Sequence, residues 1–439
     1  MSPKPSNVVV TGVGAVASIG IGIDRFWESL RVGTSGICSL EFRDDGGPKP
    51  PPGWRQSAQA GNWVGGPVIG FDAAQYVRPR KALKVMGREL QTAFSAAQMA
   101  MDQAGLAAAI ENQQISRNRV ATIFGSQMLY GPASELLDAV QGSMDSDRQC
   151  QLTRFGAAAM REIMPLWMLK YLPNMAACHV GISIGATGPN NTIVAGDVSA
   201  TSAVMEAVGA LQRGAASAVV CGATGSRIDG TYLVYRGDSP VPTVPHDVSQ
   251  TSRPHTTDAD GVVPAEAAAA LVIESRSSAA GRCATPLAMI AGHASRFSKP
   301  INRNRGSAAS IQLAIRDALC SAQMTPADIG LVVSHAMGDP QQDLAEQSAI
   351  LQSLPEVPLC MPMSIVGHSG AAIGAIHMVT AVLALVHRTI PATPQHGEIQ
   401  RALASRIRMQ PVPLEKTAVI VLTHTSHGIA NAIVLRAAE

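Results

Sequence analysis

The sequence predicts an α/β fold in which buried strands alternate with helices. Short apolar runs bounded by glycine, proline or polar residues recur along the chain, as at residues 8–17, 119–126 and 216–225. Continuous apolar runs of this kind are typical of strands that are covered on both faces. The chain has 439 residues, of which 46% are hydrophobic and 15% charged. This composition provides for a large core and leaves little room for disorder.

The N-terminal part of the chain follows this alternation. A strand at residues 8–17 contains glycines, and the helix that follows ends at Gly33. Proline and glycine are frequent at residues 39–70, which predicts a long surface loop. Further predicted elements are a helix that ends at Gly105, a strand at 119–126 and a mainly helical segment at 130–180.

A sharp turn is predicted in the segment GPNNTIVAGDVSATSA. A short strand at residues 190–196 breaks at Gly196 and Asp197, and a helix follows it. Enzymes often place a nucleophile at such a strand-to-helix turn, but the residue here is an aspartate. The simplest interpretation is that the Asp197 carboxylate caps the new helix by accepting its backbone N–H groups.

The C-terminal part repeats the strand, helix and strand order. It follows a turn-rich segment at residues 236–261, and its predicted strands are 268–275, 286–294, 329–338 and 417–425, with helices at 307–322 and 370–388. The same order occurs before and after about residue 255. We therefore expect two similar halves, residues 1–255 and 256–439.

Several function classes find no support in the composition. The formal net charge is +2, which gives no argument for nucleic acid or an anionic membrane. The seven cysteines are odd in number and form no CxxC pair, so neither a disulfide framework nor a zinc site is indicated. No apolar run reaches the roughly 18 residues that span a bilayer. We expect a cytoplasmic protein.

The segment GVGAVA, residues 12–17, matches a dinucleotide-binding pattern after a strand. That motif requires a helix to begin within the glycine turn, so that its N-terminus faces the pyrophosphate. The next residues, SIGIGID, have no helical period. We expect instead that glycines line the end of a strand that packs against another strand.

Several long segments in order resemble the β-ketoacyl-acyl carrier protein synthases, the condensing enzymes of fatty acid and polyketide synthesis. They include the segment around Asp260 and Glu266. The segments are VVVTGVGAVASIG, LPNMAACHVGISIGATGPNNTIVAG, SRPHTTDADGVVPAEAAAALVIE, SHAMGDPQQDLAEQSAI, MSIVGHSGAAIGA and THTSHGIANAIVL.

The resemblance implies the thiolase fold, in which two similar halves form five layers, αβαβα, usually as a homodimer. It also implies a decarboxylative condensation. A Cys thiolate receives an acyl group from the phosphopantetheine arm of an acyl carrier protein, and two histidines assist decarboxylation. No metal and no separate cofactor are expected. The Cys position falls at Asp197, and the two histidines match His335 and His368.

Other positions depart from the family pattern. Met363 stands at the family's lysine, Met337 and Asp339 at two threonines that bind the pantetheine arm, and Thr425 at a gatekeeping phenylalanine. These four residues are the expected substrate-binding positions.

Four more residues belong to these segments, and Ser199 lies just after the second of them. Asp343 and Glu346 match family positions, and we expect a hydrogen-bonding or ion-pair role for them. His424 and His427 have H-x-x-H spacing, but on a strand their side chains would lie on opposite faces, so we do not infer a metal site. Ser199 is not expected to replace the nucleophile, because its hydroxyl would point a different way around the turn.

The aspartate changes the expected chemistry. A carboxylate is a weak nucleophile toward thioesters, and the malonyl carboxylate of the substrate would lie close to it. Two carboxylates about 4 Å apart repel by about 4 kcal/mol at an effective dielectric constant near 20. Condensation through Asp197 is therefore disfavoured.

Three functions remain open. The chain is a non-condensing, chain-length-factor-like subunit that pairs with a Cys-bearing synthase. Alternatively, it is an acyltransferase or decarboxylase that acts on acyl- or malonyl-carrier protein through His335 and His368. The third possibility is a 3-oxoacyl-carrier protein synthase with an unrecognised nucleophile. Co-purification, CO2 release and intact mass after acylation discriminate among them.

Overall fold

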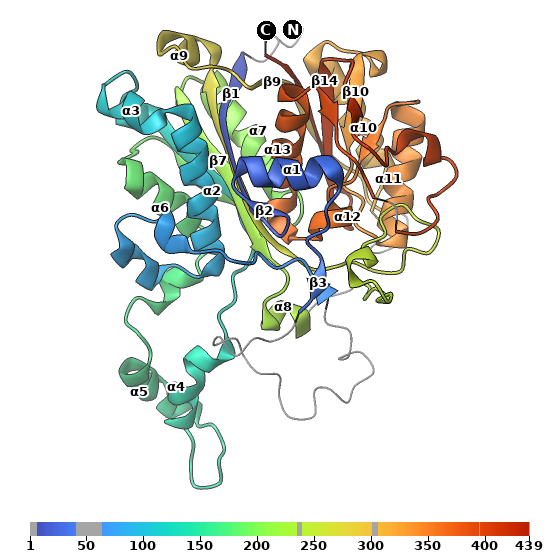
Figure 1. Cartoon of the computed structure of the whole chain (residues 1–439). Helices are drawn as coiled ribbons and strands as arrows, with labels where there is room; N and C mark the ends of the chain where they lie inside the picture. The colour runs from blue at the N-terminus through green and yellow to red at the C-terminus, as the bar shows by residue number, and fades with distance from the viewer. Residues whose placement is uncertain (1–6, 41–63, 235–238, 301–305, 395, 439) are drawn as a thin grey trace.

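The computed structural model describes residues 7–40, 64–234, 239–300, 306–394 and 396–438. The long loop predicted at residues 39–70 falls mostly outside these ranges. In the described part, strands and helices alternate as the sequence predicts (Figure 1).

Most strands form one mixed sheet with the order β11-β10-β14-β15-β9-β1-β8-β7-β5-β6, and the short strand β2 pairs with β1. The short strands β3 and β4 form a separate pair, as do β12 and β13. Five strands on each side of the β1–β9 junction repeat one order: β6-β5-β7-β8-β1 corresponds to β11-β10-β14-β15-β9. The bounds are β1 Val8–Ala17, β2 Gly20–Ile21, β5 Val120–Gly125, β6 Asn190–Ile193, β7 Ala218–Ser226, β8 Glu266–Ser275, β9 Ala288–Phe297, β10 Ile329–Val333, β11 Leu359–Cys360, β14 Ala418–His424 and β15 Ile429–Ala437.

The two strand sets are joined by a short stretch of pairing between β1 and β9. Val8, Val9 and Val10 of β1 pair with residues 288–290 of β9. Strand β8 comes after the expected division at residue 255, yet it pairs with β1 and β7 and so lies in the first set. The division into residues 1–255 and 256–439 stays a prediction.

Helices complete the five layers that the resemblance implies. Helices α7 (Ser199–Gln212) and α13 (Ile373–Val386) lie between the two strand sets. Helices α2 (Arg88–Ala104) and α6 (Met175–Ile184) cover the outer face of the first set. Helices α10 (Ala308–Ala322) and α11 (Pro340–Ser353) cover the outer face of the second.

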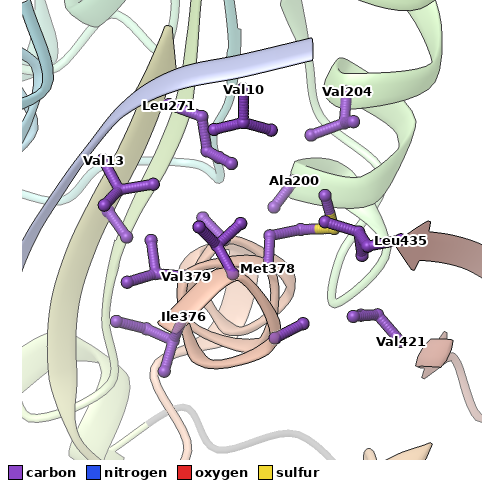
Figure 2. Packing of buried hydrophobic residues seen from close by; sticks show 14 of the residues in the cluster. Val10, Val13, Ala200, Val204, Leu271, Ile376, Met378, Val379, Val421 and Leu435 are labelled. Atoms are coloured by element: carbon purple, nitrogen blue, oxygen red, sulfur yellow. The ribbon is translucent and has the colours of Figure 1, made fainter. Parts of the chain in front are cut away.

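The central layer holds the main core. Figure 2 shows Met378 and Val379 of α13 between Leu271 of the first strand set and Val421 and Leu435 of the second. Helix α13 is apolar almost all round, as expected for a helix that is buried on every side. Because the core surrounds α13, the residues just before this helix are held in a fixed place.

The glycines of GVGAVA have a role that the sequence analysis did not predict. Strand β1 runs through both of them, and no helix begins within the motif. A Cβ atom at Gly12 or Gly14 would lie about 2 Å from the carbonyl oxygens of Ala100 and Ala96 in α2. The expected packing against another strand is confirmed, because both glycines pair with β8, and they also allow close approach of a helix.

The remaining elements are short. Helices α4 and α5, in the segment predicted to be mainly helical, project away from the body of the molecule (Figure 1). The bounds are α1 Ile23–Val32, α3 Leu106–Glu111, α4 Leu137–Gln141, α5 Leu152–Glu162, α8 Gly230–Val234, α9 Arg276–Gly281, α12 Met363–Val366, β3 Cys38–Ser39, β4 Val64–Gly65, β12 Thr389–Ile390 and β13 Val412–Pro413. None of the helices in the described ranges is long and apolar enough to cross a bilayer.

Short 3-10 helices connect several of these elements. They are Ala73–Gln75, Arg80–Val85, Arg117–Arg119, Ala133–Leu136, Trp167–Lys170, Val248–Gln250, Pro326–Asp328, Gly370–Ala372 and Ala404–Arg406.

Candidate functional site

Asp197 lies in the turn between β6 and α7, directly after Gly196, whose φ is +61°. The predicted capping role was wrong, because the N-cap residue of α7 is Val198 and no side chain caps this helix. The Ser199 hydroxyl donates to the Gly196 carbonyl (2.6 Å) and accepts from the Ala195 N–H (2.8 Å). Ser199 thus holds the turn, and the Asp197 carboxylate is available to face the interior.

Both predicted histidines lie near Asp197. His368 precedes α13, and its Nε2 lies 3.1 Å from Asp197 Oδ2. The backbone N–H of His368 donates to the Val263 carbonyl at 2.7 Å, and the His368 carbonyl accepts the Ala265 N–H at 2.9 Å. These two hydrogen bonds anchor the backbone from which the ring extends. His335 follows β10 and is fully buried, with Nε2 3.8 Å from the same Oδ2 atom. The structure therefore brings the three predicted catalytic positions together.

Arg227 is a site residue that the sequence analysis missed. It follows β7, and one guanidinium nitrogen lies 3.6 Å from Asp197 Oδ1. Burial alone would raise the pKa of Asp197, but His368, His335 and Arg227 outweigh burial and hold that pKa well below its usual range. Asp197 is therefore an anion that pairs with Arg227 and contacts both histidines.

Glu346 of α11 forms the second charged centre, and it is fully buried. Oε1 accepts the backbone N–H of His335 at 2.8 Å, and Oε2 accepts the Ser334 hydroxyl at 2.9 Å. The Nε2 atoms of His255 and His424 lie 3.5 and 3.9 Å from Oε2. Burial would raise the pKa of Glu346, but these two histidines hold it well below the ordinary value.

Asp343, one turn earlier on α11, holds the loop that follows His335. Its carboxylate accepts the backbone N–H groups of Met337 (2.9 Å), Gly338 (3.0 Å) and His255 (3.0 Å). The expected hydrogen-bonding role of Asp343 and Glu346 is thus what the structure shows. Burial would lower the pKa of His255, yet Glu346 and Asp343 raise it.

His424 stands beside His335, although the sequence analysis assigned it no role. It ends β14, and its ring centre lies 4.6 Å from that of His335 in an edge-to-face arrangement. Burial, and then His424, lowers the pKa of His335, so His335 is held neutral. Burial likewise lowers the pKa of His377, whose ring centre lies 6.0 Å from that of His335, to about 3.

His427 lies in the turn beyond β14 and is exposed, so it does not share the environment of His424. Within the described ranges, no group of three His, Cys, Asp or Glu side chains is arranged to hold a metal ion.

The predicted substrate-binding positions fall into two groups. Met337 and Met363 are buried together in a small apolar cluster. Asp339 caps α11 through the N–H groups of residues 341 and 342, at 3.0 and 3.3 Å. Across the turn between β14 and β15, the Thr425 N–H donates to the Ile429 carbonyl, and the Thr425 hydroxyl accepts the Ile429 N–H. Asp339 and Thr425 are thus engaged in local structure.

A small pocket adjoins Arg227 and His368, two of the residues that contact Asp197. A pocket of about 30 Å³ is lined by Arg227, Tyr232, Ser239, Val262, Pro264 and His368. That volume has room for one or two water molecules. This pocket, as its described residues line it, has no room for a larger group.

Asp197→Asn is expected to lower the pKa of His335 further, because the Asp197 anion is one of the charges that raises it. An NMR titration of the histidine Cε1–H signals measures this change. Glu206→Gln, which alters an exposed ion pair with Arg213, serves as the control. An unchanged or higher pKa of His335 in Asp197→Asn would contradict the assigned contact.

Comparisons with known proteins agree with these features. The family model described as "Beta-ketoacyl synthase, N-terminal domain" matches residues 6–279, and that described as "Beta-ketoacyl synthase, C-terminal domain" matches residues 287–396. The chain is 29% identical to the tetracenomycin polyketide synthase ketoacyl synthase beta subunit of Streptomyces glaucescens, over 98% of each chain. It is 28% identical to 3-oxoacyl-acyl-carrier-protein synthase 2 of Synechocystis sp., over 89% of this chain and 88% of that protein.

Solved structures share the fold over the whole length of both chains. One is the ishigamide ketosynthase/chain length factor, with a TM-score of 0.81 and 22% identity. Another is a type II polyketide synthase acyl-carrier protein in complex with its ketosynthase, with a TM-score of 0.80 and 22% identity. The two family matches together span most of the chain, and the chain therefore belongs to the β-ketoacyl synthase family and has its thiolase fold.

Proposed function

We propose that this chain is a non-condensing subunit of fatty acid or polyketide biosynthesis that pairs with a Cys-bearing ketosynthase, as a chain length factor does. The observation that carries the proposal is the state of Asp197. The residue at the nucleophile position is an anion held between His368, His335 and Arg227.

The chemistry of a carboxylate supports this function. Attack of Asp197 on a thioester would give an anhydride, which hydrolyses readily, and pairing with Arg227 and His368 further reduces its nucleophilicity. The anion also opposes the malonyl carboxylate that a condensation requires. The pocket of about 30 Å³ that Arg227 and His368 line has no room for an acyl group.

The surface near β6 supports association with a partner. β6 is the last strand of the sheet, and an edge strand offers unpaired backbone groups to another chain. Ile182 of α6 and Val194 after β6 are exposed apolar residues there. The preceding segment exposes more, namely Leu152, Met160, Leu166 and Met168. Exposed apolar surface of this kind is typical of interaction sites.

The comparisons suggest two kinds of partner. One relative is named as a beta subunit of a ketoacyl synthase, and one structure of this fold is a ketosynthase/chain length factor. A third protein of this fold is bound to its acyl-carrier protein. We propose a heterodimer with a Cys-bearing synthase that serves an acyl carrier protein.

Co-expression with a tagged Cys-bearing homologue tests this proposal. A complex of one copy of each chain is expected, and the intact mass of this chain should stay unchanged after incubation with acyl-carrier protein. Val194→Asp should weaken the complex, whereas Met409→Asp, at an exposed apolar residue elsewhere in the chain, should not. A stable homodimer that ignores the homologue would contradict the proposal.

A second candidate is malonyl decarboxylation. The observation that favours it is that His335 and His368 both converge on one oxygen of Asp197, so the two histidines face a common point. Release of CO2 from malonyl-carrier protein, abolished by His335→Ala, would support this activity. The partner-subunit proposal expects no such release from the chain alone.

A further inference from the structure

Arg227 closes the Asp197 site from the end of β7. Its backbone N–H donates to the Ala265 carbonyl at 2.8 Å, which anchors the residue against β8. The guanidinium reaches Asp197 on one side and lies over the ring of Tyr232, 5.5 Å from its centre, on the other. The Tyr232 hydroxyl donates in turn to the Met128 carbonyl. Both ends of the Arg227 side chain are thus held.

The backbone before α13 makes room for this side chain. Gly370 has a φ of +63°, and a Cβ atom there would lie 2.7 Å from Arg227 Nε. The guanidinium therefore occupies a slot that exists because residue 370 has no side chain. Arg227, Tyr232 and His368 together form walls of the 30 Å³ pocket.

We propose that Arg227 is a specificity-determining residue that excludes acyl thioesters from this site, held in place by its hydrogen bond to Ala265 and by the Tyr232 ring, independently of its ion pair with Asp197. The inference rests on the proposed function and adds a cause: the site is blocked by a side chain as well as lacking a thiol. An acyl thioester needs room for several heavy atoms where the pocket admits one or two waters.

The proposal separates two effects of replacing Asp197. In Asp197→Cys, the thiol lies near Arg227, and a cationic neighbour lowers a thiol pKa and favours the thiolate. A two-oxygen reagent such as hydrogen peroxide is small enough to reach that thiolate. An acyl thioester is not, as long as Arg227 keeps its place. Restoring the nucleophile alone therefore does not restore acylation.

Acyl transfer to the thiol introduced by Asp197→Cys tests this inference in the full chain. The probe is hexanoyl-N-acetylcysteamine: the sulfur of residue 197 forms a new bond to the acyl carbon, the old thioester bond breaks, and N-acetylcysteamine leaves as a thiol with the proton. The variants are Asp197→Cys, Asp197→Cys with Arg227→Ala, and Asp197→Cys with Arg213→Ala. Arg213 forms an exposed ion pair with Glu206 and serves as the matched arginine control.

Acylation at residue 197, measured by peptide mass mapping, is expected to be at least about tenfold faster with Arg227→Ala than in the other two variants. Peroxide should oxidise the thiol of residue 197 in all three. Equal acylation of Asp197→Cys with and without Arg227→Ala overturns the inference, and so does an absence of acylation in the Arg227→Ala variant. Arg227→Gln, which is neutral and shorter, serves as a second variant if alanine prevents folding. Co-purification of the unaltered chain with its partner is scored separately, so loss of this inference leaves the proposed function standing.

Discussion

Replacing Glu346 with alanine is expected to lower the free energy of unfolding by about 3–5 kcal/mol, the cost of breaking a buried charged pair. Glu346 is fully buried and accepts hydrogen bonds from the His335 backbone and the Ser334 hydroxyl. Its removal leaves both donors without this acceptor and removes the anion beside His255. Urea unfolding at pH 6 measures the loss.

Two variants serve as controls for this result. Glu346→Gln keeps the shape and an oxygen that can accept from His335, so its loss should be smaller than that of alanine. Glu206→Ala removes one partner of an exposed pair with Arg213 and should cost at most about 1 kcal/mol. A loss in Glu346→Ala no larger than in Glu206→Ala would contradict the role given to this carboxylate.

The pH dependence follows from the two pKa directions. The pKa of Glu346 is lowered from 4.5, so its contribution is present above pH 4.5 and is lost as the pH falls through the folded value. The pKa of His255 is raised from 6.5, so its contribution is present below pH 6.5 and is lost as the pH rises through the folded value. The difference between wild type and Glu346→Gln should therefore be largest between about pH 4.5 and 6.5.

Local pattern was sufficient for most of the fold. The apolar runs that became β1, β5 and β7 are continuous and short, and the helices end at glycines such as Gly105 with a left-handed φ. Strand partners are not local. Strand β8 follows the expected division at residue 255 but pairs with β1 and β7. Strands that are far apart in the sequence can form hydrogen bonds with each other, so a local pattern does not predict which strands pair.

The candidate site was predictable only where a motif marked it. The turn at Asp197 and the glycine-flanked His368 belong to stretches that resemble the family. Both residues could therefore be identified as site residues from the sequence. Arg227 follows a strand and lies outside these stretches. His255 lies within one of them, SRPHTTDADGVVPAEAAAALVIE, but no role was assigned to it there. Their contacts join residues far apart in the chain, which a one-dimensional pattern does not encode.

The wrong expectation for Asp197 shows what decides between two roles. A carboxylate at a helix start can accept local N–H groups or turn toward distant cations. The local option was visible in the sequence, whereas Arg227 and His368 come from other elements. The Ser199 hydroxyl also makes hydrogen bonds to the backbone groups of the turn, at Ala195 and Gly196. The Asp197 carboxylate is therefore available for contacts with residues far away in the sequence.

Glu89→Gln is expected to raise the free energy of unfolding by about 3 kcal/mol at pH 8, the value that follows from 1.36 kcal/mol per pKa unit. Glu89 lies on α2 and is buried, and within the described residues its Oε1 has no hydrogen-bond partner. Burial, with added repulsion from Asp229 and Glu266, raises its pKa from 4.5 to about 7. The nearby Arg88 offsets this only in part.

The sign follows from comparing the two states. The unfolded chain ionises Glu89 near pH 4.5, whereas the folded chain resists ionisation until about pH 7, so folding is penalised increasingly between these values and fully above them. Glutamine has no such penalty. Urea unfolding should therefore give a gap over wild type that is small at pH 4 and largest at pH 8, while Glu111→Gln, at an exposed position of α3, should show none. A gap that is the same at every pH would mean that packing of the amide, and not ionisation, causes it.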